Sequence, residues 1–318
     1  MLRNIVFAID VEPDPIQHGP GESWEGTAIT LRELSALRNR VQQRTGMPFR
    51  LNWFARFDRK MERAWGPDWV PQAWLLNTAH SNGDFIGIQI HLWKWQEGRG
   101  WYNDSSNSEW RTECLNSAIE GYRGLLGETP TASRFGDRAL LQRDIQALRD
   151  AGIHYDLTLE PTHPAARNSS NAVISDEHRE LPRKPYRPSP VDFLQPQYPQ
   201  SLVPPDQDLW LLPLTLTKRP QWVRVKGAPF IVRTRLALNM VLSPRGVWAQ
   251  LSSEINRDAA EPIVIALRSG DLADPFLLSN LRLLLENLAQ APRLPSVRFA
   301  APDQAVESFA QSQEGGHG

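Results

Sequence analysis

Residues 85–91 read FIGIQIH, a short run of apolar and β-branched residues that ends in a glutamine and a histidine. A continuous apolar run of this length is typical of a strand buried on both faces, as in a parallel sheet. Comparable runs recur at residues 5–9, 51–55, 132–135, 155–159, 209–214, 263–267 and 297–300. We therefore expect a parallel sheet of short, fully buried strands.

Helical patterns alternate with these runs. One apolar face of a helix ends before Gly152, a residue suited to a helix C-terminus. It consists of Leu141, Ile145, Leu148 and Ala151. A second stripe consists of Leu277, Leu281, Leu284, Leu285 and Leu288. The alternation predicts an α/β fold, a single (β/α)7-8 barrel of parallel strands with its chemistry at the C-terminal strand ends.

One segment breaks this alternation. Residues 160–207 are rich in Pro, Ser and Asn and show neither helical nor strand periodicity. Loops of this length in a compact domain are usually functional lids or disordered. We expect a Pro-rich lid over the barrel mouth within a single domain of residues 1–310, followed by a disordered tail at residues 311–318.

Composition limits the function. The 318 residues carry a formal net charge of -1 and no long run of like charge, which argues against a nucleic-acid partner. Cys114 is the only cysteine, so an intramolecular disulfide and a Cys-rich zinc module are excluded. No apolar run approaches the roughly 18 residues of a membrane span, and the N-terminal stretch does not fit a signal peptide. We expect a cytoplasmic protein with no membrane span and a small polar ligand.

Two acids end the first predicted strand. Strand alternation places Asp10 and Glu12 on one face, before Pro13 stops the strand. Acids at the C-terminal end of a barrel strand favour a functional site. The alternative is that they solvate a loop and cap a helix.

The strand at residues 85–91 offers a second pair. Gln89 and His91 share a face by the same alternation, and a histidine with carboxylate partners is the beginning of a metal site. Arg134 follows on the next strand, where a guanidinium can fork onto a carboxylate and orient it. His91 could instead be a structural hydrogen-bonding residue, and Arg134 could equally pair structurally with an acid on a helix.

Tryptophans gather in or beside predicted loops, and Trp24, Trp53, Trp93 and Trp95 are the candidates for stacking on a sugar. The competing interpretation is that individual rings fill the core.

Taken together, these motifs resemble the NodB-type polysaccharide deacetylases of carbohydrate esterase family 4. The resemblance rests on DVE at residues 10–12, NWF at 52–54, GIQIHLW at 87–93 and SRFG at 133–136. It covers about residues 4–214 well and the remainder weakly. The family implies a (β/α) barrel and a divalent metal, commonly zinc, that polarises the acyl carbonyl and activates a water.

Transferred by position, the resemblance makes Asp10 the catalytic base, Glu12 and His91 metal ligands, and Arg134 the residue that orients the base. The substrate would be a carbohydrate, an N-acetylated sugar or glycan precursor, and the products a free amine and acetate.

Two positions depart from the family pattern. Gln89 stands where the family has the first histidine of its pair, and an amide oxygen is a weaker zinc ligand than an imidazole. Arg268 stands where the family often places the histidine that protonates the leaving amine, and arginine does not release its proton at working pH. Asp271 or a lid histidine would have to be the acid. His163 could replace the missing ligand or the missing acid, or be an ordinary solvated loop residue.

Three functions remain open at this point. The first is a metal-dependent amide hydrolase acting on an N-acyl sugar. The second is a lapsed enzyme that keeps the barrel and binds a glycan or a protein partner, which Gln89 and Arg268 favour. The third is a glycosidase that uses Asp10 and Glu12 as its carboxyl pair.

Overall fold

The computed structural model describes residues 2–14, 24–65, 70–160, 182–197, 209–225, 228–235 and 244–314. Contacts between Cα atoms group the chain into two units. The first comprises Met1–Asn52, Gly83–Phe85 and Leu214–Gly318, and the second comprises Trp53–Asn82 and Ile86–Pro213.

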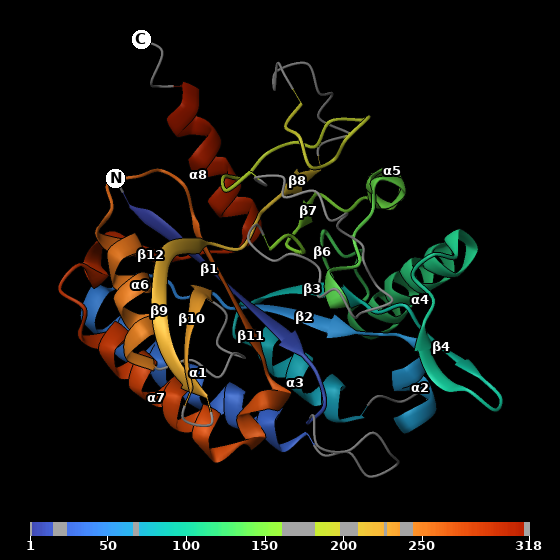
Figure 1. The fold of residues 1–318 in the computed structure, drawn as a ribbon, viewed down its shortest axis with the longest axis horizontal. Helices are drawn as coiled ribbons and strands as arrows, with labels where there is room; N and C mark the ends of the chain where they lie inside the picture. The colour runs from blue at the N-terminus through green and yellow to red at the C-terminus, as the bar shows by residue number, and fades with distance from the viewer. Residues whose placement is uncertain are drawn as a thin grey trace. The chain divides into compact units, whose positions relative to one another are not determined.

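The described strands form one main sheet with the order β11-β1-β2-β3-β6-β7-β8, and β12 pairs with β1 off this path. The pairs whose register is defined run parallel, including β1 with β11, β3 with β6, and β6 with β7. Figure 1 shows these strands with helices packed around them. The predicted fold class, parallel strands alternating with helices as in a (β/α) barrel, is confirmed.

The first unit centres on β1 (Arg3–Val11), whose nine residues are all buried. It lies between β11 (Ile263–Arg268) and β12 (Val297–Phe299). The helices of this unit are α1 (Glu25–Thr45), α6 (Pro244–Asn256), α7 (Pro275–Gln290) and α8 (Pro302–Glu314). The predicted stripe on α7 is buried at Leu281, Leu284, Leu285 and Leu288. Burial on both faces explains why residues 5–9 of β1 are continuously apolar rather than alternating.

The second unit contains the remaining strands of the main sheet. These are most of β2 (Asn52–Arg56) and β3 (Phe85–Ile90), with β6 (Ala132–Phe135), β7 (Tyr155–Asp156) and β8 (Trp210–Leu211). Its helices are α2 (Arg59–Trp65), α3 (Val70–Ser81), α4 (Ser108–Leu126) and α5 (Gln142–Asp150). Gly152 follows α5 with a left-handed φ of 77°, as its predicted position after the helix requires.

Strand β7 ends sooner than the apolar run at 155–159 predicted, because side chains take over the backbone hydrogen bonds. Asp156 Oδ1 accepts the backbone N–H of Thr158 over 2.9 Å. Thr158 Oγ1 in turn accepts the backbone N–H of Phe135 over 2.8 Å. These two bonds replace a regular ladder beyond residue 156.

Two antiparallel hairpins were not predicted from the sequence. Strands β4 (Trp93–Gln96) and β5 (Gly100–Asn103) pair in the second unit, and β9 (Leu216–Val225) and β10 (Ala228–Arg235) pair in the first. In the first hairpin, Gly98 and Gly100 adopt left-handed φ values of 75° and 79°, which turn the chain between the strands. A search for buried apolar runs misses such hairpins because their residues need not be apolar.

The predicted lid at residues 160–207 is described only at residue 160 and at residues 182–197. Within the described part, Tyr186 forms an antiparallel bridge with Leu211 of β8. The Tyr186 hydroxyl donates to the Phe193 carbonyl over 2.9 Å. Residues 182–197 are therefore held by backbone pairing to β8, and the remainder of the segment, with His163, lies outside the described residues.

The expectation of a disordered tail from residue 311 was wrong at its start, because α8 continues to Glu314. Ala305, Val306 and Phe309 of this helix are buried, which anchors it against the core. Among the described residues, none of the helices combines the length and apolar character needed to cross a bilayer.

Candidate functional site

In the first unit, the candidate residues Asp10, Glu12, Arg268 and Asp271 lie at the outgoing ends of two neighbouring parallel strands. Asp10 is in register with Arg268, the last residue of β11. The backbone carbonyl of Asp10 accepts the N–H of Ser269 over 2.9 Å, which continues the pairing into the following turn. Asp10 and Glu12 are 6% and 5% exposed, so both acids are held in the interior of the unit.

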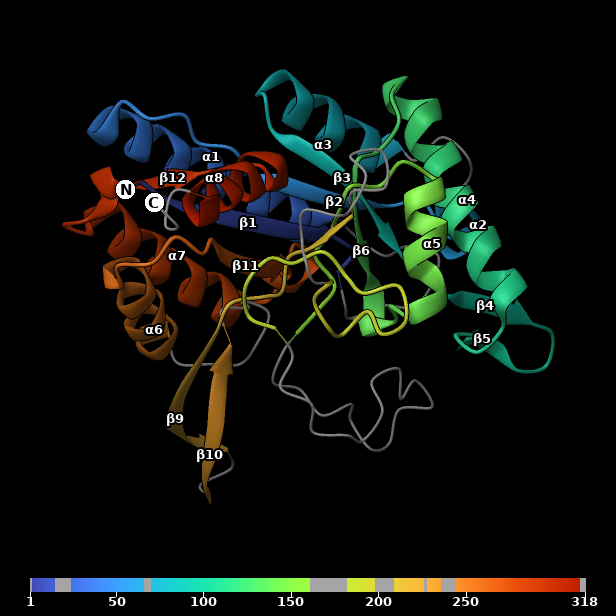
Figure 2. The same ribbon diagram turned by 90° about the horizontal axis from the view of Figure 1, so that it is seen from above.

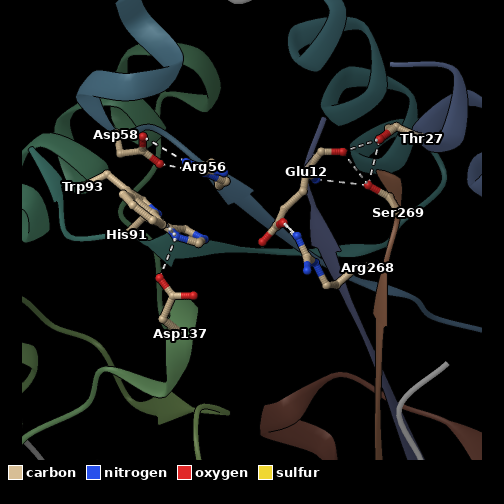
Figure 3. Close-up of polar contacts among 9 residues, drawn as sticks. All are labelled: Glu12, Thr27, Arg56, Asp58, His91, Trp93, Asp137, Arg268 and Ser269. Atoms are coloured by element: carbon tan, nitrogen blue, oxygen red, sulfur yellow. Dashed lines mark hydrogen bonds and ion pairs between the residues drawn. The ribbon is translucent and has the colours of Figure 1, made fainter. Parts of the chain in front are cut away.

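Arg268 is bound to Glu12, and this ion pair dominates the electrostatics of the cluster (Figure 3). Its Nε donates to Glu12 Oε2 over 3.0 Å, and Nη2 donates to the same oxygen. The Glu12 carboxylate raises the pKa of the Arg268 guanidinium above its ordinary value. The Glu12 side chain is only 7% exposed whereas that of Arg268 is 41% exposed, so the guanidinium also reaches solvent.

Asp271 follows in a short 3-10 turn, Gly270–Ala273. Burial raises the pKa of the Asp271 carboxyl to about 6, and the like charges of Glu12 and Asp10 push it in the same direction against Arg268. An acid with a pKa near neutrality can hold and release a proton at working pH. This unit therefore contains a candidate proton donor beside a candidate base.

A hydroxyl network fixes the backbone of these residues. Ser269 Oγ lies 2.7 Å from Thr27 Oγ1, and it accepts the backbone N–H of Glu12 over 3.1 Å. A Cβ added at Gly270 would lie 2.2 Å from the carbonyl oxygen of Pro13, so only glycine fits there. Sequence reasoning missed Thr27 and Ser269, although the Ser-Gly dipeptide directly after an apolar strand was the available signal.

In the second unit, His91 follows β3 and is 6% exposed. Its Nδ1 accepts the indole N–H of Trp93 over 3.2 Å (Figure 3). An indole nitrogen can only donate, so Nδ1 presents its lone pair and the proton of the neutral ring is on Nε2. The Asp137 carboxylate is 4.0 Å from the same Nδ1, beyond hydrogen-bond distance.

A buried ion pair that sequence reasoning missed belongs to the same unit. Arg56 Nε donates to Asp58 Oδ2 over 2.7 Å, and Arg56 Nη2 donates to Oδ1 over 3.1 Å. Burial works to raise the pKa of the Asp58 carboxyl, but the charge and hydrogen bonds of Arg56 outweigh it, and the pKa is lowered. Asp58 also accepts the backbone N–H groups that begin α2.

Gln89 and Arg134 are in register on β3 and β6. Gln89 is 1% exposed and Arg134 is 6% exposed. Arg134 donates to the carbonyl of Leu157 and lies 3.7 Å from the Glu160 carboxylate, which Arg138 also approaches to 3.7 Å. Within its own unit, Arg134 therefore forms an ion pair with Glu160.

The predicted tryptophans differ in exposure. Trp95 is 43% exposed, Trp93 and Trp24 are half-buried, and Trp53 is completely buried. Trp53 cannot stack on a ligand from this position, because its side chain has no exposed surface. The expectation that Trp53 binds a sugar was therefore wrong.

The residues present do not fit the zinc centre that the resemblance implies. Among the described residues, no three His, Cys, Asp or Glu side chains gather as a metal site would require. The Glu12 carboxylate is bound by the Arg268 guanidinium. His91 Nδ1 accepts the indole N–H of Trp93, so the proton of the neutral imidazole is on Nε2. A ligating histidine instead binds metal through one nitrogen while the other donates to a carboxylate or carbonyl. His163 lies outside the described residues.

No family model matches the chain, and no curated protein matches it either. Several solved structures, in contrast, are similar to the chain. A protein from Mycobacterium smegmatis assigned to the polysaccharide deacetylases is similar with a TM-score of 0.56 at 16% identity, covering 97% of this chain and 91% of that one. A structure from Parabacteroides distasonis, assigned as a glycoside hydrolase/deacetylase, is similar with a TM-score of 0.60 at 12% identity. The match covers 97% of this chain and 71% of that one.

A third structure, from Pseudomonas aeruginosa and also assigned to the polysaccharide deacetylases, gives a TM-score of 0.52 at 13% identity and covers 97% of this chain and 91% of that one. Identities this low carry the fold and not the chemistry. The chain has a divergent fold of the polysaccharide deacetylase type.

Proposed function

We propose that this chain is a catalytically lapsed deacetylase-like domain that binds an N-acylated sugar or glycan. The observation that carries the proposal is the ion pair between Arg268 and Glu12. The resemblance assigns Glu12 to a metal and position 268 to a proton donor. In this chain the two residues satisfy each other, and neither is available for the role that the resemblance gives it.

The energetics favour keeping the ion pair between Arg268 and Glu12 intact. Glu12 is buried, so removing its partner would leave a desolvated carboxylate without its ion pair, at a cost of roughly 1–3 kcal/mol. A metal would have to displace Arg268 before it could use Glu12. The amide oxygen of Gln89 offers zinc a weaker ligand than the imidazole that it replaces.

Arg268 retains a role that suits a binding protein. Its side chain is 41% exposed, and a guanidinium has five N–H donors, of which the contacts to Glu12 use two. The remaining donors suit the carbonyl oxygen of an N-acyl group. Glu12 fixes the orientation of this donor, which lowers the entropy that binding costs.

The test uses the purified full chain and N-acetylglucosamine oligomers. Isothermal titration calorimetry should show binding, while a zinc titration should show no tight site and an acetate assay no release. Arg268→Ala should weaken binding about tenfold or more, because one charged hydrogen bond to the ligand is lost. Arg282→Ala is the matched control, since Arg282 pairs with Glu33 on the exposed surface of the same unit. Tight zinc binding with acetate release would overturn the proposal.

One observation favours the hydrolase as a second candidate. Asp271, with its pKa raised to about 6, and buried Asp10 could serve as acid and base. Asp10 would take a proton from water as it attacks the acyl carbon, and Asp271 would give one to the amine as the C–N bond breaks. We route no step through zinc, because the donor groups do not fit it. If acetate is released, the rate should fall as pH rises through about 6, and Asp271→Asn should abolish that decline.

A further inference from the structure

The hairpin of β4 and β5 forms one wall of an open pocket of about 580 Å³ in the second unit. Figures 1 and 2 show the hairpin beside α2 and α4. All three elements contribute lining residues, which are Arg59, Glu62, Arg63, Lys94, Trp95, Trp101, Trp110 and Glu113. Three tryptophans and five charged side chains line this one pocket, and of these eight residues only Trp95 was a sugar-binding candidate from the sequence.

The tryptophans form a fixed aromatic wall. Trp95 and Trp101 face each other across the hairpin and meet edge to face, with ring centroids 5.5 Å apart and an interplanar angle of 68°. Trp110 is buried, and its indole N–H donates to the carbonyl of Leu92 over 3.1 Å. Trp95 is 43% exposed, so part of this wall faces solvent.

The cations in the pocket are not equivalent. Arg59 donates to Glu62 over 2.8 Å and lies 3.9 Å from Glu113, which leaves its charge compensated. Lys94 lies 3.4 Å from the Asp104 carboxylate. Arg63 is exposed, and in the described part of the chain it makes no ion pair.

Arg63 is also oriented. Its guanidinium carbon lies 4.1 Å from the centroid of the Trp95 ring. A guanidinium that stacks on an indole keeps its N–H groups directed outward in its own plane, where they can fork onto a carboxylate. The pocket therefore presents an aromatic surface with an uncompensated, oriented carboxylate-binding group at its edge.

We propose that this pocket binds an acidic sugar unit of a glycan chain, with the pyranose ring packed on the part of the aromatic wall of Trp95 and Trp101 that the Arg63 guanidinium does not cover, and with its carboxylate held by Arg63. The C–H groups on one face of a pyranose are apolar and fit an indole, while the ring hydroxyls remain available to the surrounding charged groups. The inference deepens the proposed function and rests on it in one respect, that the ligand is a glycan.

The experiment compares two oligosaccharides of equal length on the full chain by isothermal titration calorimetry. One alternates N-acetylglucosamine with glucuronic acid, and the other is N-acetylglucosamine alone. The acidic oligomer should bind about tenfold more tightly, a factor of the size that one charge-assisted hydrogen bond supplies. Arg63→Gln should lower the affinity for the acidic oligomer to about that for the neutral oligomer, and Trp95→Ala should weaken binding of both.

Arg99→Gln is the matched control. Arg99 belongs to the same hairpin and also stacks on an aromatic ring, that of Tyr102, with 3.9 Å to the centroid, but it is not among the residues that line the pocket. It should leave both affinities unchanged. Equal losses in Arg63→Gln and Arg99→Gln would show a general charge effect and overturn the inference.

The remaining outcomes separate this inference from the proposed function. Binding of both oligomers with equal affinity refutes the acidic subsite and leaves the proposed function standing. Binding of an oligogalacturonate through Arg63, without binding of the neutral oligomer, supports the subsite and refutes the N-acyl ligand. Absence of all glycan binding, or a preference for an acidic peptide over the acidic oligomer, refutes the subsite.

Discussion

The imidazole of His91 occupies the space where a side chain at Gly136 would begin. A Cβ built on Gly136 would lie 2.2 Å from Cε1 and 2.3 Å from Nε2 of His91. These atoms belong to a ring that is also held by the indole N–H of Trp93. The glycine of the SRFG motif therefore has a packing role, because its lack of a side chain leaves room for the His91 ring beside the backbone after β6.

Gly136→Ala should displace His91 and destabilise the protein. Overpacking of this kind costs about 1–3 kcal/mol, because neither the ring nor the backbone can move freely. Urea denaturation should show the loss, and the Trp93 indole proton should shift in NMR spectra. Gly124→Ala is the control, since Gly124 lies in α4 with nothing within 4 Å of an added Cβ. That variant should be neutral or more stable, as Ala is favoured over Gly in helices. Equal destabilisation by both would contradict the assigned contact.

Arg268→Gln should lower the free energy of unfolding by roughly 1–3 kcal/mol, the range for leaving a buried charged group without its partner. The buried Glu12 carboxylate loses both donated hydrogen bonds, whereas the exposure of Arg268 limits the effect. Chemical denaturation of the Arg268→Gln and Glu12→Gln single variants and of the double variant would measure the coupling between the two residues. A coupling energy near zero would show that the ion pair does not stabilise the native state.

The sequence predicted strands best where both faces of the strand are buried. The apolar run at residues 5–9 made β1 recognisable, and β6 was predicted at its exact bounds although Ser133 and Arg134 lie within it. The C-terminal ends of strands were the right places to look for polar clusters. Asp10 and Arg268 meet in register there, as do Gln89 and Arg134.

What the sequence could not predict was which polar groups would satisfy one another. Glu12 was expected to hold a metal, but its partner in the structure is Arg268, which lies more than two hundred residues away along the chain. Trp53 was expected to face a sugar, but a strand residue buried on both sides has no access to solvent. Pairings of this kind depend on tertiary register and burial, and no local pattern encodes them.

Two ion pairs that differ in burial test how burial determines the contribution of an ion pair to the stability of the protein. Arg111 is 3% exposed, and its Nε donates to Asp144 Oδ1 over 2.8 Å, while Asp144 also accepts the backbone N–H of Leu141 over 2.6 Å. Asp144→Ala should cost about 3–5 kcal/mol because a buried guanidinium is left uncompensated. Glu62→Ala, which breaks the exposed pair with Arg59, should cost no more than about 0.5 kcal/mol. Denaturation midpoints at one pH compare the two, and a ranking in the opposite order would contradict the assigned burial.

Asp156 should make the stability of the protein depend on pH. Its side chain is completely buried, and burial raises the pKa of the carboxyl to about 6 although Ser133 and Thr158 hydrogen-bond to it. The native state therefore binds the proton more tightly than the unfolded chain, whose pKa is near 3.8. The resulting penalty is absent below about pH 4, grows as pH rises toward 6, and is fully present above that value.

Asp156→Asn removes this titration while preserving the hydrogen bonds. The amide oxygen can still accept the N–H of Thr158, and the amide N–H₂ can donate to the Ser133 hydroxyl, which accepts as well as donates. The stability of the variant relative to the natural protein should therefore increase between pH 4 and pH 6, by at most about 3 kcal/mol for a shift of this size. Urea denaturation at intervals across this range measures the difference. Asp150→Asn, at an exposed position on α5, should give a curve nearly parallel to that of the natural protein. If the Asp156→Asn curve is parallel as well, the carboxyl is not protonated in the native state near pH 5, and its burial must be compensated by charge rather than by proton uptake.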